Sequence, residues 1–190
     1  MENAGIAVIR KFEERDADNV RDICAEADDS FSPGQRGVLL TLYCNYYIEQ
    51  EPESCLVLAD ENDDAVGYCI AASDWVLYKA RFSKVYLPVL RRRGGILHVL
   101  RKKSETRLLD SFAESYPAHL HIDLREGWRG RGYGTKLLAE MAELLAVGGV
   151  KGIMLGVGAE NTGAQRFYER FGYSVIGKAY NCIYYGYSIS

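Results

Sequence analysis

A glycine-rich turn between two strongly patterned segments is the feature of this sequence that most restricts its fold. In the stretch HLHIDLREGWRGRGYGTKLL, residues 119–138, polar and apolar side chains first alternate, which predicts a strand over 118–124. Apolar residues then recur at helical spacing, which predicts a helix that begins near Gly132 and ends before Gly148. Gly130, Gly132 and Gly134 lie between the two, and glycine lets a backbone come close to a ligand.

The turn has the chemistry of an anion site. A helix N-terminus presents unpaired N–H groups and the positive end of a dipole, and Arg129 and Arg131 add positive charge. The spacing lacks the later glycine of a dinucleotide-binding GxGxxG motif, and Thr135 precedes Lys136 where a Walker A loop has the reverse order. A diphosphate fits this chemistry, and a glycine-rich connection with solvated arginines is the alternative.

Length and composition restrict the class of protein. A chain of 190 residues with 48% hydrophobic and 26% charged residues is typical of one globular domain, here residues 1–190. The net charge of −3 argues against a dedicated nucleic-acid binder. The five cysteines show no metal-ligand spacing, so we expect reduced thiols and no metal. No apolar run is long enough to span a membrane, and no secretory signal opens the sequence, so we expect a cytoplasmic protein without membrane contact.

The rest of the chain reads as alternating strands and helices. Residues 6–12 predict a strand, 13–29 and 36–52 predict helices, and 54–75 predict a hairpin around the polar turn DENDD. Residues 76–116 show no strand pattern, so we expect a helical insertion there. After the central helix, residues 152–158, 173–178 and 179–189 predict strands and 162–172 a helix. Thr162 and Gln165 match a capping box, which would leave Asn161 free outside that helix. This order predicts an α/β fold with a mixed sheet of about six to seven strands flanked by helices.

Two motifs resemble those of a known enzyme family. Arg129, Gly132 and Gly134 match the R/Q-x-x-G-x-G/A signature of the GNAT superfamily of acetyl-CoA-dependent N-acetyltransferases. The segment NTGAQRFYERFGY, residues 161–173, resembles the N-x-x-A-x-x-F/L-Y-x-x-x-G-F/Y segment of the same family. The resemblance is strong over residues 118–178 and weak over the N-terminal hairpin, and it implies a GNAT fold.

A narrower resemblance rests on residues 54–74, 116–124 and 156–173. These segments are similar to the stand-alone bacterial relatives of the acetyltransferase-like domain at the C-terminus of animal O-GlcNAcase. The animal domain has lost much of the cofactor loop and is regarded as a pseudo-acetyltransferase. This chain keeps the loop, so the inactive relative is a poor guide to its activity.

The family resemblance assigns residues to acetyl-CoA. It implies that the strand before the loop separates from its neighbour and that the backbone groups of Ile122 and Leu124 pair with the pantetheine arm. The amide of Ile122 would polarise the thioester carbonyl. The amides of Gly130, Arg131, Gly132, Tyr133, Gly134 and Thr135 would hold the pyrophosphate, with Arg129 and Arg131 as charge partners. Asn161 would bind near the pantetheine, with a turn role as the alternative.

Acetyl transfer to an amine needs an acid and a base. Tyr168 resembles the tyrosine that the family directs at the sulfur, and its alternative role is a core aromatic. His119, His121 and Asp123 share one strand face, and the ordinary pKa of His121 suits proton transfer near neutrality. Structural hydrogen bonding is the alternative for each of the three. Asp74, at the end of the hairpin, is a further candidate base.

The resemblance and these residues predict an acetyl-CoA-dependent N-acetyltransferase that transfers acetyl directly to a primary amine. A non-catalytic acetyl-CoA-binding pseudo-acetyltransferase and an acyltransferase that uses another acyl-CoA are the alternatives. The acceptor stays open between a protein tail, a small amine, an amino sugar and an antibiotic, and the protein is expected to be a monomer or a homodimer. The basic stretch RRRGGILHVLRKK, residues 91–103, is expected to be a solvated face of the insertion, with contact to an acidic substrate or to nucleic acid as the alternatives.

Overall fold

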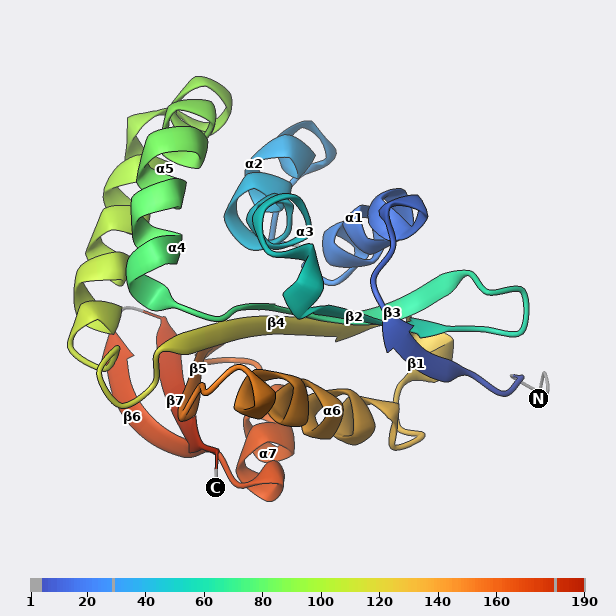
Figure 1. Ribbon diagram of the computed structural model, residues 1–190. Coiled ribbons are helices and arrows are strands. Elements are labelled where there is room, and N and C mark those ends of the chain that lie inside the picture. Colours follow the sequence, from blue (N-terminus) through green and yellow to red (C-terminus); the bar gives the residue numbers. More distant parts are fainter. Residues whose placement is uncertain (1–4, 29, 180, 190) are drawn as a thin grey trace.

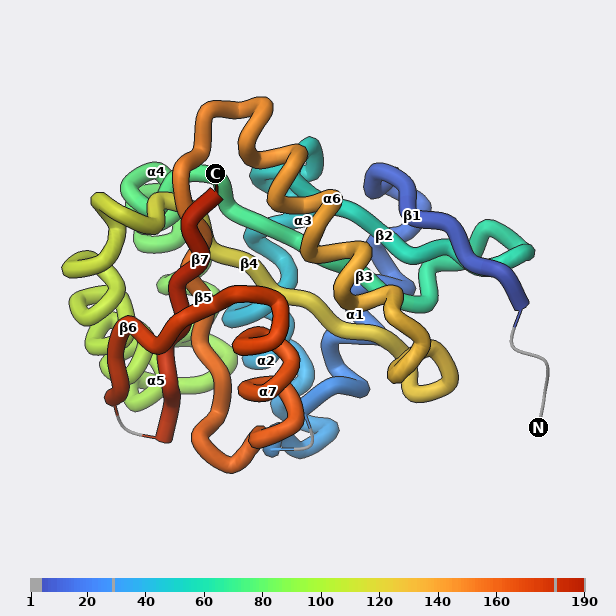
Figure 2. The backbone as a smooth tube through the Cα atoms, turned by 90° about the horizontal axis from the view of Figure 1, so that it is seen from below, coloured from blue at the N-terminus to red at the C-terminus, as the bar shows by residue number. Residues whose placement is uncertain are grey.

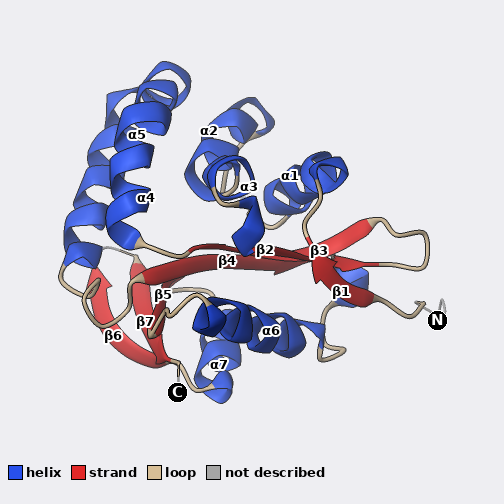
Figure 3. Cartoon of the chain, viewed as in Figure 1, coloured by secondary structure: helices blue, strands red, loops and turns tan. Residues whose placement is uncertain are grey.

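The computed structural model describes residues 5–28, 30–179 and 181–189. They form a seven-stranded mixed sheet in the order β1-β2-β3-β4-β5-β7-β6, with helices on both faces (Figures 1 and 3). The strands are β1 (Val8–Lys11), β2 (Cys55–Ala59), β3 (Ala65–Ala72), β4 (Ala118–Leu124), β5 (Gly152–Gly158), β6 (Ser174–Ala179) and β7 (Cys182–Ser188). The predicted α/β class and the mixed sheet are confirmed.

Helices cover the two faces of the sheet in separate groups. On one face lie α1 (Ala17–Glu26), α2 (Arg36–Tyr43) and α3 (Asn45–Gln50), and on the other lie α6 (Tyr133–Val147) and α7 (Thr162–Phe171) (Figure 1). Each face buries its own apolar cluster, because alternate side chains of a strand point to opposite faces. Tyr46, Tyr47 and Tyr68 lie in the first cluster, and Leu137 and Tyr168 lie in the second.

The segment before β4 is a helical hairpin. It contains α4 (Trp75–Arg81), a π-helical turn (Phe82–Tyr86) and α5 (Leu87–Asp110). α5 is interrupted at Gly95, whose φ of 77° and ψ of −176° are not helical. The chain reverses there and returns to the sheet (Figure 1), so the hairpin stands on one end of the sheet with its tip near residues 91–97. The helical character predicted for 76–116 is confirmed over most of that range.

The sheet opens at its centre. The parallel strands β4 and β5 pair only at Ala118 with Ile153 and at His119 with Met154. Beyond these pairs the two strands diverge, as Figure 2 shows from the other direction. The N-terminal three residues of β4 are buried, whereas the next four are half-buried. The predicted separation of the strand that precedes the glycine-rich turn is therefore present.

Several sequence predictions need correction. The helix expected over 36–52 is two helices, broken at Cys44, whose φ of −130° is not helical. Asn161 does not lie free outside its helix, because it is the N-cap and its side chain accepts the amide of Ala164 at 3.0 Å. The basic stretch is not fully solvated, since Lys102 is buried. Asp29 and Tyr180, in the predicted helix over 13–29 and strand over 179–189, lie outside the described residues.

Candidate active site

The open edge of β4 offers backbone groups to a ligand. Arg125 donates to Val66 across the β3–β4 ladder at 3.0 Å. Because hydrogen-bonding direction alternates along an antiparallel strand, the N–H and C=O groups of Ile122 and Leu124 point the other way, into the opening toward β5. The carbonyl of Leu124 accepts the Arg129 Nε at 2.7 Å, which leaves its N–H and both groups of Ile122 facing the opening.

The glycine-rich turn leads directly from this edge into α6. Gly130 and Gly132 adopt φ values of 72° and 83°, in the left-handed region that favours glycine. Gly132 is the N-cap of α6, and the first N–H groups of a helix have no intrahelical partner. The amides from Gly132 to Thr135 and the positive end of the α6 dipole therefore meet at the end of the β4 opening, which fits a diphosphate.

Gly134 has a different role from its two neighbours. A Cβ atom at this position would lie 3.1 Å from Phe167 Cζ and 3.5 Å from Leu124 Cδ1. A Cβ on Gly130 or Gly132 would meet nothing within 4 Å. Gly134 thus allows α6 to pack closely on α7 and β4, whereas the other two glycines set the backbone path of the turn.

Aromatic rings pack against Arg131 of the turn. The guanidinium carbon of Arg131 lies 5.0 Å from the Trp128 ring centre and 5.6 Å from that of Tyr133. The Tyr133 hydroxyl accepts the amide of Ala7 at 3.2 Å, which ties the turn to the N-terminal segment before β1. This packing keeps an exposed positive charge beside the amides of α6.

Asp123 is the carboxylate at the open edge of β4. Its Oδ2 accepts the hydroxyl of Tyr68 at 2.5 Å, from the directly opposite position on β3. Burial raises the pKa of Asp123 to about 6, while the Tyr68 hydrogen bond and the charge of Arg129 act in the lowering direction. A carboxyl group with this pKa exchanges a proton close to neutral pH.

The two histidines of β4 lie on the same face as Asp123, among aromatic rings. The His121 ring lies 5.4 Å from that of Tyr43 and 5.2 Å from that of Tyr47. Burial and the positive charge of Lys102 lower the pKa of His121 to about 3. The expectation that His121 titrates near neutrality does not hold, because burial, and after it the charge of Lys102 from α5, disfavours the protonated ring.

His119 is enclosed by aromatic rings. Its ring centre lies 4.2 Å from that of Tyr78 and 5.1 Å from that of Trp75, and its Nε2 is 2.7 Å from the Tyr47 hydroxyl. Its other ring nitrogen has no hydrogen-bond partner among the described residues. Burial lowers the pKa of His119 well below its usual value, so a neutral structural ring describes this residue better than a base.

Tyr168 lies below β4, on the face opposite Asp123. It is buried among the rings of Phe167, Tyr173 and Tyr185. Burial raises the pKa of Tyr168, and the negative charge of Asp123 raises it further. Its hydroxyl is therefore protonated throughout the neutral range and has a proton to donate.

The structure uses Asp74 and Asn161 as helix caps. Asp74 is the exposed N-cap of α4, and its carboxylate accepts the amide of Leu77 at 2.9 Å. Asn161, which is also exposed, caps α7 in the same way. A local hydrogen-bonding role accounts for both residues.

Sequence reasoning missed two residues of this region. Tyr68 was not identified because the register that sets it opposite Asp123 comes from the β3–β4 pairing. Lys102 belongs to a basic stretch expected to be solvated, yet its amine is buried and lowers the pKa of both histidines. Neither position carries a local sequence signal. The described residues bring together no group of three His, Cys, Asp or Glu side chains that could hold a metal ion.

Comparisons with known proteins agree with this geometry. A sequence profile described as "Acetyltransferase (GNAT) family" matches residues 20–173. The crystal structure of SsHAT is 29% identical and superposes with a TM-score of 0.85, covering 97% of this chain and 98% of that one. Ard1 from Thermoplasma volcanium is 16% identical, with a TM-score of 0.63 and coverage of 97% and 98%. A chain of the NatC complex bound to Gag peptide and CoA is 12% identical, with a TM-score of 0.63 and coverage of 97% and 99%. The last two similarities show the fold alone.

Proposed function

The chain belongs to the GNAT acetyltransferase family, and from this premise we propose that it transfers an acetyl group directly from acetyl-CoA to a primary amine. The observation that carries the proposal is the juxtaposition at the end of β4. An opened strand edge, the N-terminus of α6 and a carboxylate with a pKa of about 6 lie along one path. This arrangement suits a thioester with a diphosphate at its far end and an acceptor on the Asp123 side.

Acetyl-CoA supplies the acetyl thioester, and the residues of the chain supply binding and proton transfer. The amides at the start of α6 and the guanidinium of Arg131 hold the pyrophosphate. The N–H and C=O of Ile122 and the N–H of Leu124 pair with the pantetheine arm. The Ile122 N–H donates to the thioester oxygen and stabilises its negative charge during attack.

Two side chains divide the proton transfers. Asp123 accepts a proton from the ammonium form of the acceptor and so produces the nucleophilic amine. As the C–S bond breaks, Tyr168, from the other face of β4, donates its hydroxyl proton to the departing thiolate. The second proton of the attacking nitrogen, lost as the amide forms, restores the tyrosine hydroxyl. His121 and Asp123 lie on the acceptor side, where His121 remains neutral and orients the acceptor by hydrogen bonding.

A screen of amine acceptors that monitors release of free thiol tests this function. We expect thiol release that depends on both acetyl-CoA and an amine, with the acetyl group recovered on the acceptor nitrogen. Binding of acetyl-CoA without turnover on protein tails, small amines or amino sugars would favour a non-catalytic acetyl-CoA-binding module. Faster turnover with another acyl-CoA would identify that thioester, in place of acetyl-CoA, as the acyl donor. The narrower relationship to bacterial relatives of the O-GlcNAcase C-terminal domain stays a prediction.

A further inference from the structure

The helical hairpin has a positive net charge, unlike the chain as a whole. Residues 75–110 contain ten Lys and Arg but two Asp and Glu, whereas the whole chain has 23 and 26. Both acids of the hairpin are already paired, Glu105 with Lys102 at 3.1 Å and Asp110 with Lys79 at 2.7 Å. The hairpin is therefore a strongly positive arm on an acidic protein.

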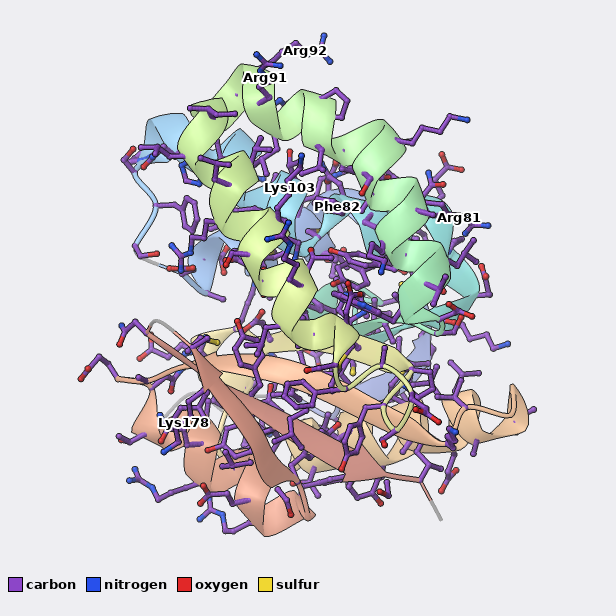
Figure 4. The ribbon with its side chains drawn as sticks, turned by 90° about the vertical axis from the view of Figure 1, so that its left-hand side faces the viewer. Arg81, Phe82, Arg91, Arg92, Lys103 and Lys178 are labelled. Atoms are coloured by element: carbon purple, nitrogen blue, oxygen red, sulfur yellow. The ribbon has the colours of Figure 1, made fainter. Side chains whose placement is uncertain are left out.

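A groove runs between the two arms of this hairpin. Two adjoining cavities of about 220 and 700 Å³ share Ser83, Leu87 and Lys103 in their walls. Figure 4 shows this side of the molecule, with Phe82 and Lys103 between the arms and Arg91 and Arg92 at the tip. Two residues at the inner wall of the groove, Tyr78 and Lys102, also act on the β4 histidines: the Tyr78 ring packs on His119, and the charge of Lys102 lowers the pKa of His121.

The lining of the groove combines cations with an apolar floor. Arg91, Arg92, Lys103 and Arg107 line it, and none of the four forms an ion pair with another described residue. The apolar parts of the floor come from Phe82, Leu87, Pro88 and Val99. Among the residues that the structure describes, no Asp or Glu lines either cavity. A negatively charged ligand with apolar side chains complements this surface.

The face of α5 that borders the groove also combines cations with apolar side chains, and it extends toward the tip of the hairpin. Ile96, Leu100, Lys103 and Arg107 follow one another at spacings of four, three and four residues, so they share one face of α5. Ile96 and Leu100 are 54% and 56% exposed, and the neighbouring Leu97 is 77% exposed. Exposed aliphatic side chains beside free cations mark a surface that a partner covers.

We propose that this groove binds an extended acidic segment of a partner protein, one in which Asp or Glu residues are interspersed with aliphatic ones. The carboxylates pair with Arg91, Arg92, Lys103 and Arg107, and the aliphatic side chains pack on Leu87, Val99 and Leu100. Single-stranded nucleic acid fits less well, because the two aromatic residues in the lining, Tyr78 and Phe82, are buried and offer no open face for base stacking. The proposal does not rest on the acetyl-transfer function.

Fluorescence anisotropy with the full chain tests the proposal. The probe is a fluorescein-labelled peptide of roughly a dozen residues that alternates Glu with Leu and Ile, and its control peptide carries Gln in place of every Glu. We expect saturable binding of the acidic peptide only, weakened severalfold when the ionic strength rises from about 0.05 to 0.3 M.

Two charge-matched double variants locate the binding. Arg92→Glu/Lys103→Glu removes two groove cations, and we expect it to weaken peptide binding about tenfold or more. Lys151→Glu/Lys178→Glu makes the same change in net charge at exposed positions outside the hairpin, as the label of Lys178 in Figure 4 shows, and binding should be retained. Circular dichroism checks that both variants fold, and all four positions are exposed.

Several outcomes would overturn the proposal. These are absence of peptide binding, equal loss in the two double variants, and binding that the groove variant leaves unchanged. Tighter binding of a DNA oligonucleotide or of phosphatidylserine vesicles than of the acidic peptide would assign the surface to a different class of partner. Concentration-dependent dimerisation that the groove variant abolishes would assign it to a second copy of the chain.

Discussion

Replacing Tyr68 with phenylalanine should move the acidic limb of the pH profile of acetyl transfer to higher pH. The Tyr68 hydroxyl donates to Asp123 at 2.5 Å and stabilises the ionised carboxylate, so it holds the pKa of Asp123 lower than burial alone would set it. Removing the hydroxyl leaves the buried carboxylate with one donor fewer. The proton is then bound more tightly, and the base becomes active only at higher pH.

The size of the shift follows from the strength of the hydrogen bond. A hydrogen bond to a charged group contributes about 1.5–3 kcal/mol, and about 1.4 kcal/mol corresponds to one pKa unit. The pKa of Asp123 should therefore rise from about 6 to roughly 7–8 in Tyr68→Phe. Arg129, whose positive charge acts in the lowering direction, and Asp28, whose negative charge acts in the raising direction, are unchanged in the variant.

The assay is kcat/KM for thiol release between about pH 5 and 9 with one amine acceptor, because this ratio reports the ionisations of the free enzyme and free acceptor. Using the same acceptor throughout cancels the titration of its own amine. Tyr43→Phe is the matched control, since Tyr43 packs against His121 on the same face but donates no hydrogen bond to Asp123. An acidic limb that does not move in Tyr68→Phe, or that moves equally in Tyr43→Phe, would refute the assignment of Asp123 as a base tuned by Tyr68.

Four further predictions use other parts of the site. Asp123→Asn should raise the free energy of unfolding at pH 8 by about 1–3 kcal/mol, because a carboxyl with a folded pKa near 6 is costly to ionise in the folded state. The gain, measured by urea unfolding, should vanish at pH 4, and equal stabilities at pH 8 would contradict the buried-carboxylate account. His119 and His121 bind protons less tightly when folded, with a pKa of about 3 for His121. Stability should thus fall as pH drops below about 6.5, less steeply in His119→Gln/His121→Gln, and identical slopes would argue against it. Gly132→Ala forces a side chain into φ 83°, so the melting temperature should fall by several degrees and calorimetry should show weaker acetyl-CoA binding; retained affinity would mean that the turn does not hold the phosphates. Tyr168→Phe should lower kcat about 100-fold or more with an unchanged Kd for acetyl-CoA, and an unchanged kcat would reassign Tyr168 to packing.

Local pattern was sufficient to predict most of the fold. The alternation over 118–124 corresponds to β4, and the helical stripe that begins near Gly132 and ends before Gly148 corresponds to α6, because period and capping act over a few residues. The break at Cys44 was not predicted, because the apolar pattern continues across it and packing decides the backbone conformation there.

The chemistry of the acceptor side depended on contacts between distant residues. The sequence placed His119, His121 and Asp123 on one strand face. The structure confirms this, because Tyr47 lies beside both histidines, Tyr68 lies beside Asp123, and the two tyrosines belong to the same apolar cluster. It could not show that Lys102, from the inserted helix, lies close enough to depress the pKa of both histidines. Nor could it show that Tyr68 faces Asp123, because strand register is a property of the folded sheet.

Calorimetric titration of the purified protein with acetyl-CoA tests the central claim most directly. The opened edge of β4 and the amides at the start of α6 predict one binding site per chain with a Kd in the roughly micromolar range. The same titration with a coenzyme A fragment that lacks the pyrophosphate should show much weaker binding. Absence of binding at several hundred micromolar acetyl-CoA would mean a Kd on the order of 1 mM or more. That result would contradict the assignment of β4 and α6 to an acetyl-CoA site.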